Sequence, residues 1–171
     1  NSVGYLNVDD YQITLIPVPS TFTPMVSITL DDGWVSAYEN AKPILDAHNF
    51  KATYYITTGL LSVPGYMNDQ QVANLISNGY DIQSHTVNHP FLTSLNDADL
   101  EYELVQSKAY LESHFGITVN GIASPYGDVD QRVIDKIKTI YSYHRGVQSD
   151  FNYANTFDKY NLLVQNLELS T

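Results

Sequence analysis

The sequence contains no cysteine, which excludes disulfide bonds and thiol chemistry from the fold and from the function. Basic residues are scarce: eight lysines and arginines stand against nineteen aspartates and glutamates, giving a formal net charge of −11. A chain with this charge and no basic run is not expected to bind nucleic acid or anionic membrane surfaces. No stretch approaches the roughly 20 apolar residues that a membrane-spanning helix needs. These absences indicate an acidic globular protein.

The 171 residues, 43% of them hydrophobic, suffice for one domain with a sizeable buried core. From residue 25 onward, strand patterns alternate with helix patterns without a repeat or a linker, which predicts one α/β domain with a mainly parallel sheet. Residues 1–24 have no helical period and contain three prolines, so we expect a covering or edge segment there. Because the chain begins with asparagine, we expect a processed or excised piece.

Helical periodicity is clearest in two segments. Residues 35–48 place apolar side chains, Ile44 among them, along one predicted helix face. A longer helix is predicted over residues 97–114, with leucines forming its apolar stripe. We expect its glutamates to form the solvated face; these are Glu101, Glu103 and Glu112.

An aspartate pair follows an apolar run near the start of the domain. Residues 25–30 have the pattern of a buried strand, and Asp31, Asp32 and Gly33 come directly after it. The C-terminal end of a core strand is where α/β proteins usually keep their chemistry. Because Gly33 can interrupt the strand, both carboxylates could reach one pocket, one holding a metal and the other accepting a proton. A solvated loop start is the alternative.

Two histidines four residues apart follow another predicted strand, at residues 80–83. His85 and His89 face the same way if their segment makes one helical turn, which Pro90 would stop from extending. A lone histidine is more often structural than a ligand, but a pair at this place favours metal binding. Imidazoles together with a carboxylate suit a divalent metal such as Zn²⁺, with positions left for water and substrate.

Together these two segments resemble the polysaccharide deacetylases, the NodB-homology domains of carbohydrate esterase family 4. Residues 29–33 read Thr-Leu-Asp-Asp-Gly, similar to the T-F-D-D-G motif of the family, and residues 85–89 read His-Thr-Val-Asn-His, similar to its H-S/T-x-x-H motif. The resemblance covers about residues 25–168. It implies a distorted (β/α) barrel and a metal-dependent hydrolase that removes acetyl groups from a glycan, most of all one containing N-acetylglucosamine.

The resemblance also assigns individual roles. It implies Asp32, His85 and His89 as metal ligands and Asp31 as the general base. The backbone N–H of Tyr126 would donate to the oxyanion, with a packed aromatic side chain as the alternative reading. The expected metal is Zn²⁺, with Co²⁺ or Ni²⁺ as alternatives, and the expected partner is an acetylated glycan. Family resemblance and the fourteen tyrosines lead us to expect an extracellular or cell-surface protein.

The chain departs from the family pattern at two places. The third motif of the family usually reads R-P-P-Y, its arginine pairing with the base aspartate, whereas residues 123–126 read Ala-Ser-Pro-Tyr. Since alanine cannot pair, we predict that Arg145 orients Asp31; a surface salt bridge is the alternative for this arginine. The terminal L-x-L-H-like motif, whose histidine is the general acid in the family, is not found in the chain. We therefore expect the domain over residues 25–171 to lack its final helix and strand.

These departures keep a second function open. A glycan-binding module that retains the metal but has lost turnover is the alternative, although Asp31 has no evident use in such a site. Among the remaining histidines, His144 is the candidate substitute for the general acid. Flat aromatic faces suit sugar rings, so three aromatic sites are candidates for stacking, with ordinary packing as the alternative. They are Trp34, Tyr66 and the loop at residues 151–153.

Overall fold

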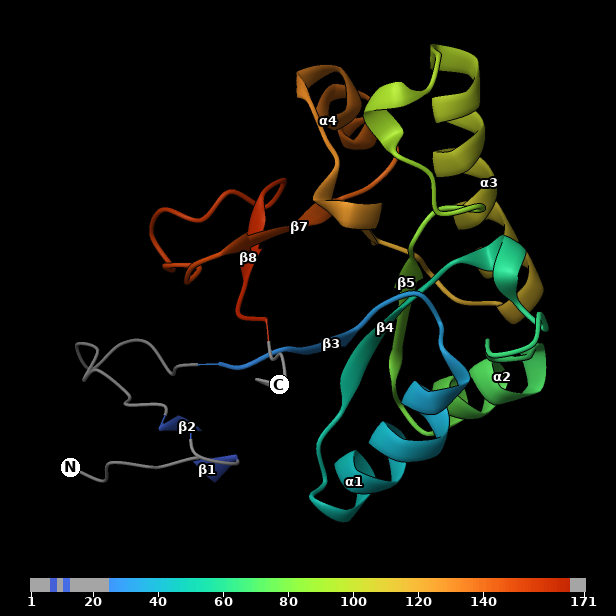
Figure 1. Cartoon of the computed structure of the whole chain (residues 1–171), viewed down its shortest axis with the longest axis vertical. Helices are drawn as coiled ribbons and strands as arrows, with labels where there is room; N and C mark the ends of the chain where they lie inside the picture. Colours follow the sequence, from blue (N-terminus) through green and yellow to red (C-terminus); the bar gives the residue numbers. More distant parts are fainter. Residues whose placement is uncertain (1–6, 9–10, 13–24, 167–171) are drawn as a thin grey trace.

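A computed structural model describes residues 7–8, 11–12 and 25–166 of the chain (Figure 1). At its centre is a six-stranded sheet in which strands β3 to β8 follow one another in chain order and every neighbouring pair is parallel. This sheet curls into part of a barrel, which confirms the expected incomplete (β/α) barrel (Figure 1). The strands are β3 Ile28–Leu30, β4 Ala52–Ile56, β5 Asp81–Ser84, β6 Gly121–Ala123, β7 Tyr143–Ser149 and β8 Leu162–Val164.

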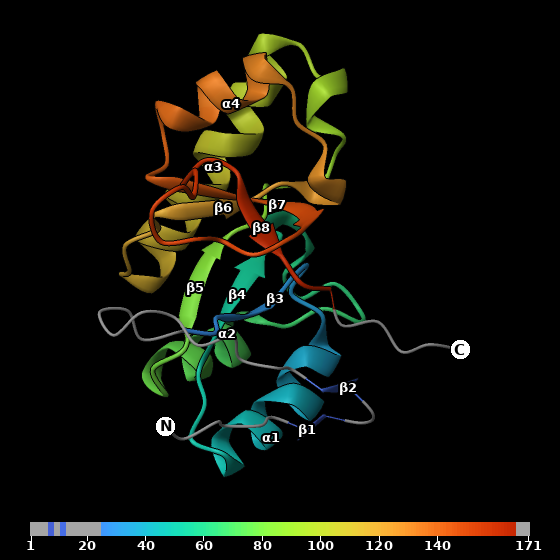
Figure 2. The ribbon, with the colours of Figure 1, turned by 90° about the vertical axis from the view of Figure 1, so that its left-hand side faces the viewer.

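Helices connect the strands from β3 to β7 and lie on the outer side of the curled sheet, whereas a loop connects β7 to β8 (Figure 1). All connections between the parallel strands are crossovers. As a result β3, β4 and β5 run side by side in the same direction and end at the same edge of the sheet (Figure 2). The helices are α1 Lys42–Ala47, α2 Asp69–Ser77, α3 Asp97–Phe115 and α4 Gln131–Lys138, and short 3₁₀ turns occupy Thr58–Leu60, Leu92–Ser94 and Pro125–Gly127.

The local sequence explains where the helices begin and end. Asn68 caps α2 by accepting a hydrogen bond from the Gln71 N–H at 2.9 Å, while the Gln71 side chain accepts one from the Asn68 N–H at 2.9 Å. Asn96 caps α3 in the same way, through the Asp99 N–H at 2.9 Å. The last turn of α3 ends at Gly116, whose φ of 66° is left-handed.

The helix predicted over residues 35–48 is less regular than expected. A π-helical segment, Ala37–Ala41, precedes α1, and Pro43 lies in the first turn of α1, where its missing N–H costs little. The wider π turn shifts the phase of the helix. As a result Leu45 is buried but Ile44, expected on the inner face, is 62% exposed, so that prediction was wrong.

The expected solvated face of α3 is also wrong at one position. Glu101 is exposed and Glu112 half-exposed, but Glu103 is buried with only 5% of its surface accessible. Leu100, Glu103 and Leu104 stand at positions i, i+3 and i+4 of the helix and so share one face. The two leucines pack against the core, and Glu103 therefore lies on the inner face of α3. Other fully buried core residues include Tyr54, Ile56, Val72, Leu75, Leu111, Ile122 and Ile137.

Most of the expected N-terminal covering segment, residues 1–24, lies outside the described residues. Within it, β1 Asn7–Val8 pairs antiparallel with β2 Tyr11–Gln12. The last strand, β8, ends at Val164, and residues 167–171 lie outside the described part. In the part of the chain that the structure describes, no helix is long and apolar enough to cross a membrane.

Candidate active site

The two motifs meet because β3 and β5 end at the same edge of the parallel sheet. After β3 the chain turns sharply, with Asp32 at φ 69° and Gly33 at φ 84°, and the Gly33 N–H donates to the Asp31 carbonyl at 2.8 Å. Aspartate is among the few residues that tolerate a left-handed conformation. The turn breaks strand alternation, and both aspartates stand at this end of β3.

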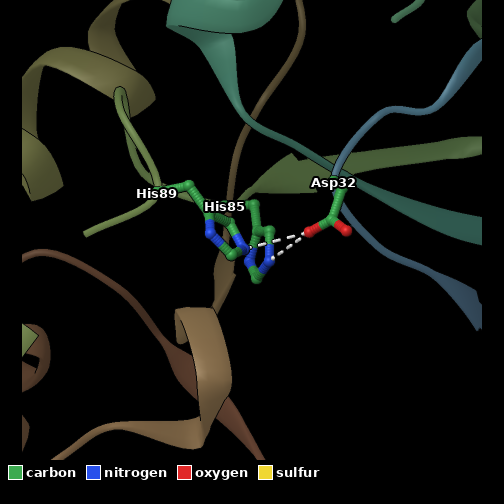
Figure 3. Close-up of side chains that lie close together, drawn as sticks. All are labelled: Asp32, His85 and His89. Carbon is green, nitrogen blue, oxygen red and sulfur yellow. Dashed lines mark ion pairs between the residues drawn. The ribbon is translucent and has the colours of Figure 1, made fainter. Parts of the chain in front are cut away.

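Asp32, His85 and His89 converge (Figure 3). The Asp32 Oδ1 atom lies 3.1 Å from His85 Nε2 and 3.0 Å from His89 Nε2, and the three candidate ligand atoms all lie within 4.8 Å of one another. The histidines do not share the helical turn we considered. Instead Thr86 and His89 have left-handed φ values of 69° and 60°, and this bend brings the two imidazoles together.

Neighbouring groups orient two of these side chains. His85 Nδ1 lies 2.8 Å from the Ala123 carbonyl oxygen and donates to it, because a carbonyl can only accept. The Nε2 atom of His85 then faces Asp32. The Trp34 indole N–H donates to the other Asp32 oxygen, Oδ2, at 2.8 Å, so Oδ1 is left for the histidines. Two imidazole nitrogens and one carboxylate oxygen thus face one another. The donor set fits a divalent metal.

The electrostatics agree with this donor set. Hydrogen bonding to His85, aided by the Trp34 indole, lowers the pKa of Asp32 to about 2. Burial, together with the neighbouring His85, lowers the pKa of His89 below its usual range. Asp32 is therefore ionised and His89 neutral at pH 7, which are the protonation states that metal ligation requires.

Arg145 donates from its Nη2 atom to the Asp31 carboxylate. Its guanidinium is buried, lies 5.0 Å from the centre of the Tyr55 ring, and donates from Nη1 to the Gly146 carbonyl at 3.2 Å. Ala123 and Arg145 are paired residues in the β6–β7 register. The arginine therefore stands one strand away from the position of the arginine in the family motif, and it is a buried partner of Asp31 rather than a surface ion pair.

The candidate aromatic residues fall into two groups. Trp34 stacks on Tyr66 with ring centres 4.3 Å apart. Tyr126, with an exposed side chain and φ of 58°, stacks on Phe91 at 4.2 Å and meets the edge of His89 at 4.6 Å. Both pairs thus adjoin the cluster of candidate ligands. By contrast, the loop at residues 151–153 lines a separate groove within the connection from β7 to β8.

His144 is not a candidate general acid. Its side chain is fully buried, Nε2 is 2.7 Å from the Ser124 hydroxyl, and Nδ1 is 2.9 Å from the Tyr160 carbonyl. Because neighbouring strand residues point to opposite faces, His144 faces away from Arg145 and the site. Burial also lowers its pKa, so the ring is neutral at pH 7 and holds three strands together.

The sequence did not lead us to expect that Glu103 contacts the loop between the two histidines. Glu103 on α3 accepts hydrogen bonds from the backbone N–H groups of Val87 and Asn88, in the loop between the two histidines. The signal was present in the sequence: Glu103 lies on the same helical face as Leu100 and Leu104, where an apolar residue is expected.

The comparisons identify the class of protein. The sequence profile of the polysaccharide deacetylase family matches residues 20–141, and the chain belongs to that family. Among its relatives are the NodB-type deacetylases of carbohydrate esterase family 4, and the curled parallel sheet and the two motifs are those of this domain.

Several of the similar proteins are named as deacetylases. Chitin deacetylase 1 of Cryptococcus neoformans is 28% identical over 116 residues, which are 67% of this chain and 20% of that protein. The peptidoglycan-N-acetylglucosamine deacetylase PgdA of Listeria monocytogenes is 24% identical over 114 residues, 66% of this chain and 23% of that protein. The Streptococcus pyogenes deacetylase PplD, solved in complex with acetate, superimposes with a TM-score of 0.77 at 25% identity, covering 86% of this chain and 65% of that chain.

The matched regions amount to 44%, 34% and 20% of the first three curated relatives. The chain therefore spans less than half the length of these proteins.

Proposed function

We propose that this chain is a metal-dependent hydrolase that removes acetyl groups from an acetylated carbohydrate, with an N-acetylglucosamine-containing polysaccharide as its substrate. The observation that carries the proposal is the convergence of Asp32, His85 and His89 beside a second carboxylate, Asp31, which a buried arginine holds. Relatives named for chitin and for peptidoglycan N-acetylglucosamine support the substrate class.

Asp32, His85 and His89 would hold the divalent metal, Zn²⁺ or alternatively Co²⁺ or Ni²⁺. Three ligands from the protein leave coordination positions for water and substrate, as catalytic zinc sites require. When bound, such a metal supplies Lewis acidity, which polarises the acetyl carbonyl and makes water acidic enough to attack near pH 7.

The remaining residues supply the proton transfer and the orientation. Asp31 accepts a proton from the attacking water, and the hydrogen bond from Arg145 orients that carboxylate. The N–H of Tyr126 donates to the oxygen that becomes negative as water adds to the carbonyl carbon. The bond from the acetyl carbon to nitrogen then breaks as the proton held by Asp31 passes to the nitrogen, which releases acetate and the free amine.

We further propose that the two aromatic pairs contact sugar rings. Trp34 and Tyr66 adjoin the candidate metal ligands through the Trp34–Asp32 hydrogen bond, and Tyr126 and Phe91 adjoin them through the edge contact of Tyr126 with His89. Exposed flat rings with polar edges suit the faces of pyranose rings.

The test is acetate release from N-acetylglucosamine oligomers, peptidoglycan and acetylated xylan, measured on chelated protein and again after Zn²⁺ or Co²⁺ is restored. We expect release only with metal, and its loss by at least about 10²-fold in Asp31→Asn, which removes the base but no candidate ligand. Asp135→Asn, at an exposed position on α4, is the matched control and should match the wild-type chain. Metal uptake with glycan binding but no release would favour the glycan-binding module instead.

A further inference from the structure

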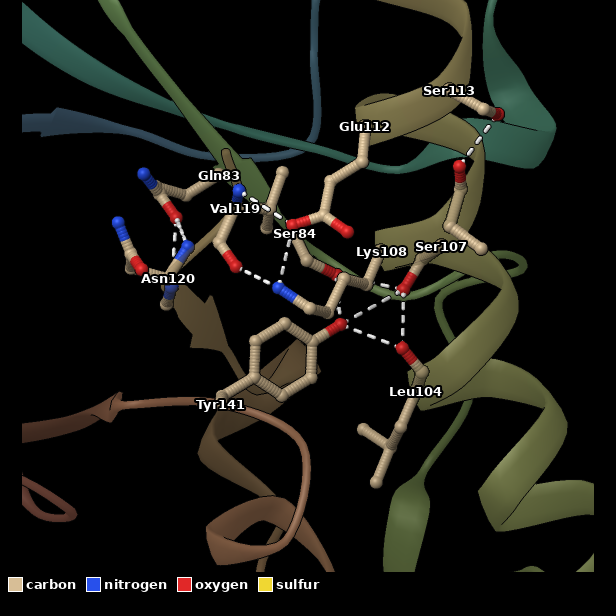
Figure 4. Close-up of polar contacts among 12 residues, drawn as sticks. Gln83, Ser84, Leu104, Ser107, Lys108, Glu112, Ser113, Val119, Asn120 and Tyr141 are labelled. Atoms are coloured by element: carbon tan, nitrogen blue, oxygen red, sulfur yellow. Dashed lines mark hydrogen bonds and ion pairs between the residues drawn. The ribbon is translucent and has the colours of Figure 1, made fainter. Parts of the chain in front are cut away.

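Helix α3 contacts the histidine-bearing segment on both sides of His85. On one side, Ser107 Oγ lies 2.7 Å from Ser84 Oγ, and Tyr141 donates to the same Ser84 hydroxyl at 2.9 Å (Figure 4). On the other side, one helical turn earlier, Glu103 binds the loop that leads to His89. Ser84 ends β5, so α3 holds both the end of this strand and the loop that follows it.

The contacts of Glu103 are directed at this loop. Its Oε2 accepts from the Val87 N–H at 2.8 Å and from the Asn88 N–H at 2.9 Å, and its Oε1 accepts from the Asn88 side-chain amide at 2.7 Å. Among the described residues, no cation forms an ion pair with Glu103. A buried carboxylate is costly unless it is compensated, and these three donors of the loop are its compensation.

The same loop is strained. Thr86 has a φ of 69°, in the left-handed region that β-branched residues rarely adopt. His89 lies in the same region, with a φ of 60°. One local bond, from the His89 N–H to the Thr86 hydroxyl at 3.0 Å, bridges the two strained positions. Conformations of this kind persist only where the surrounding structure enforces them.

We propose that Glu103 is a positioning residue for the metal ligands: it holds the backbone between His85 and His89 in the strained bend that makes both imidazoles converge on Asp32. This inference rests on the metal-dependent function proposed above. Glu103 touches none of the three candidate ligand side chains, so it acts by preorganising them. Without it the bend can relax, and metal binding must then restore the strained conformation.

The test compares Glu103→Gln with Glu101→Gln, which removes the same charge at an exposed position of the same helix. Glutamine has nearly the shape of glutamate, but it places an amide donor against the donors of the loop. We expect Co²⁺ to bind Glu103→Gln about tenfold more weakly than the wild-type chain, the loss typical of residues that orient metal ligands. The visible absorption spectrum of the bound Co²⁺ should also change, whereas Glu101→Gln should match the wild-type chain in both measurements.

A second variant guards against misfolding of Glu103→Gln. Asn88→Ala removes one of the three donors at an exposed position, and should weaken Co²⁺ binding by a smaller factor without lowering the melting temperature of the metal-free chain. Wild-type affinity in every folded variant, with an unchanged Co²⁺ spectrum, would refute the role of Glu103 and leave the proposed function intact. A wild-type chain that binds no divalent metal would overturn the proposed function and this inference together.

Discussion

Replacing Arg145 by alanine should slow acetate release about tenfold and leave metal affinity unchanged. The guanidinium is buried, whereas the side chain of its partner Asp31 is 37% exposed, so water can solvate the abandoned carboxylate. The loss therefore lies between the values for an exposed and for a buried ion pair, about 1–2 kcal/mol. If the pair matters fully in the transition state, this corresponds to a rate loss of about 5- to 30-fold.

The assay is the initial rate of acetate release with metal present, alongside the affinity for Co²⁺ and the melting temperature. Arg145 forms no hydrogen bond with the three candidate ligands, so only the rate should fall. Lys136→Ala removes an exposed cation that pairs with Glu101 and is the control.

A relocation experiment sharpens the test. Because Ala123 and Arg145 are paired in register, Ala123→Arg combined with Arg145→Ala moves the arginine to the position it holds in the family motif. We expect the double variant to recover part of the rate. An Arg145→Ala variant within about twofold of the wild-type rate would refute the assignment of Arg145.

Three further predictions concern positioning, packing and pH. Trp34→Phe keeps an aromatic ring but removes the hydrogen bond to Asp32. Co²⁺ binding, measured by competition with a chelator, should weaken by at most about tenfold. Unchanged affinity would show that the indole N–H is dispensable. Gly121→Ala would place a Cβ inside the ring of Tyr143 and should destabilise the chain by about 1–3 kcal/mol. The melting temperature should then fall by several degrees. An unchanged melting temperature would mean that the ring can move aside. Burial holds the pKa of His144 in the folded chain below the 6.5 of the unfolded chain, so the unfolded state takes up a proton first as the pH falls. Urea unfolding of the metal-free chain should therefore show a free energy of unfolding that decreases below about pH 6.5. An equally large decrease in His144→Asn would exclude this histidine as the cause.

Much of this architecture was predictable because its signals are local. The alternation of apolar strands and helices indicates the α/β class, and caps such as Asn68 and Asn96 mark helix starts through bonds to residues three positions away. The candidate ligands Asp32, His85 and His89 were predictable because each follows a strand, and parallel strands bring their ends to one edge.

The contacts that complete the site depend on tertiary structure. Arg145 reaches Asp31 across 114 positions of sequence, and only the order and register of the strands bring them together. The π turn before Pro43 and the strained bend after His85 are backbone conformations that helix and strand propensities do not predict. The surrounding packing enforces them.

The sequence by itself determined which residues are candidates for the chemistry and at which strand ends they lie, because both depend on local patterns and on parallel strands ending at a common edge. Only the tertiary structure decided which groups hold those residues in place. The bonds of Glu103 form only when α3 packs against the histidine loop, and those of His144 only when β7 lies beside Ser124 and Tyr160. Burial and partners are properties of the packed chain, and they determine which titratable groups are available at the site.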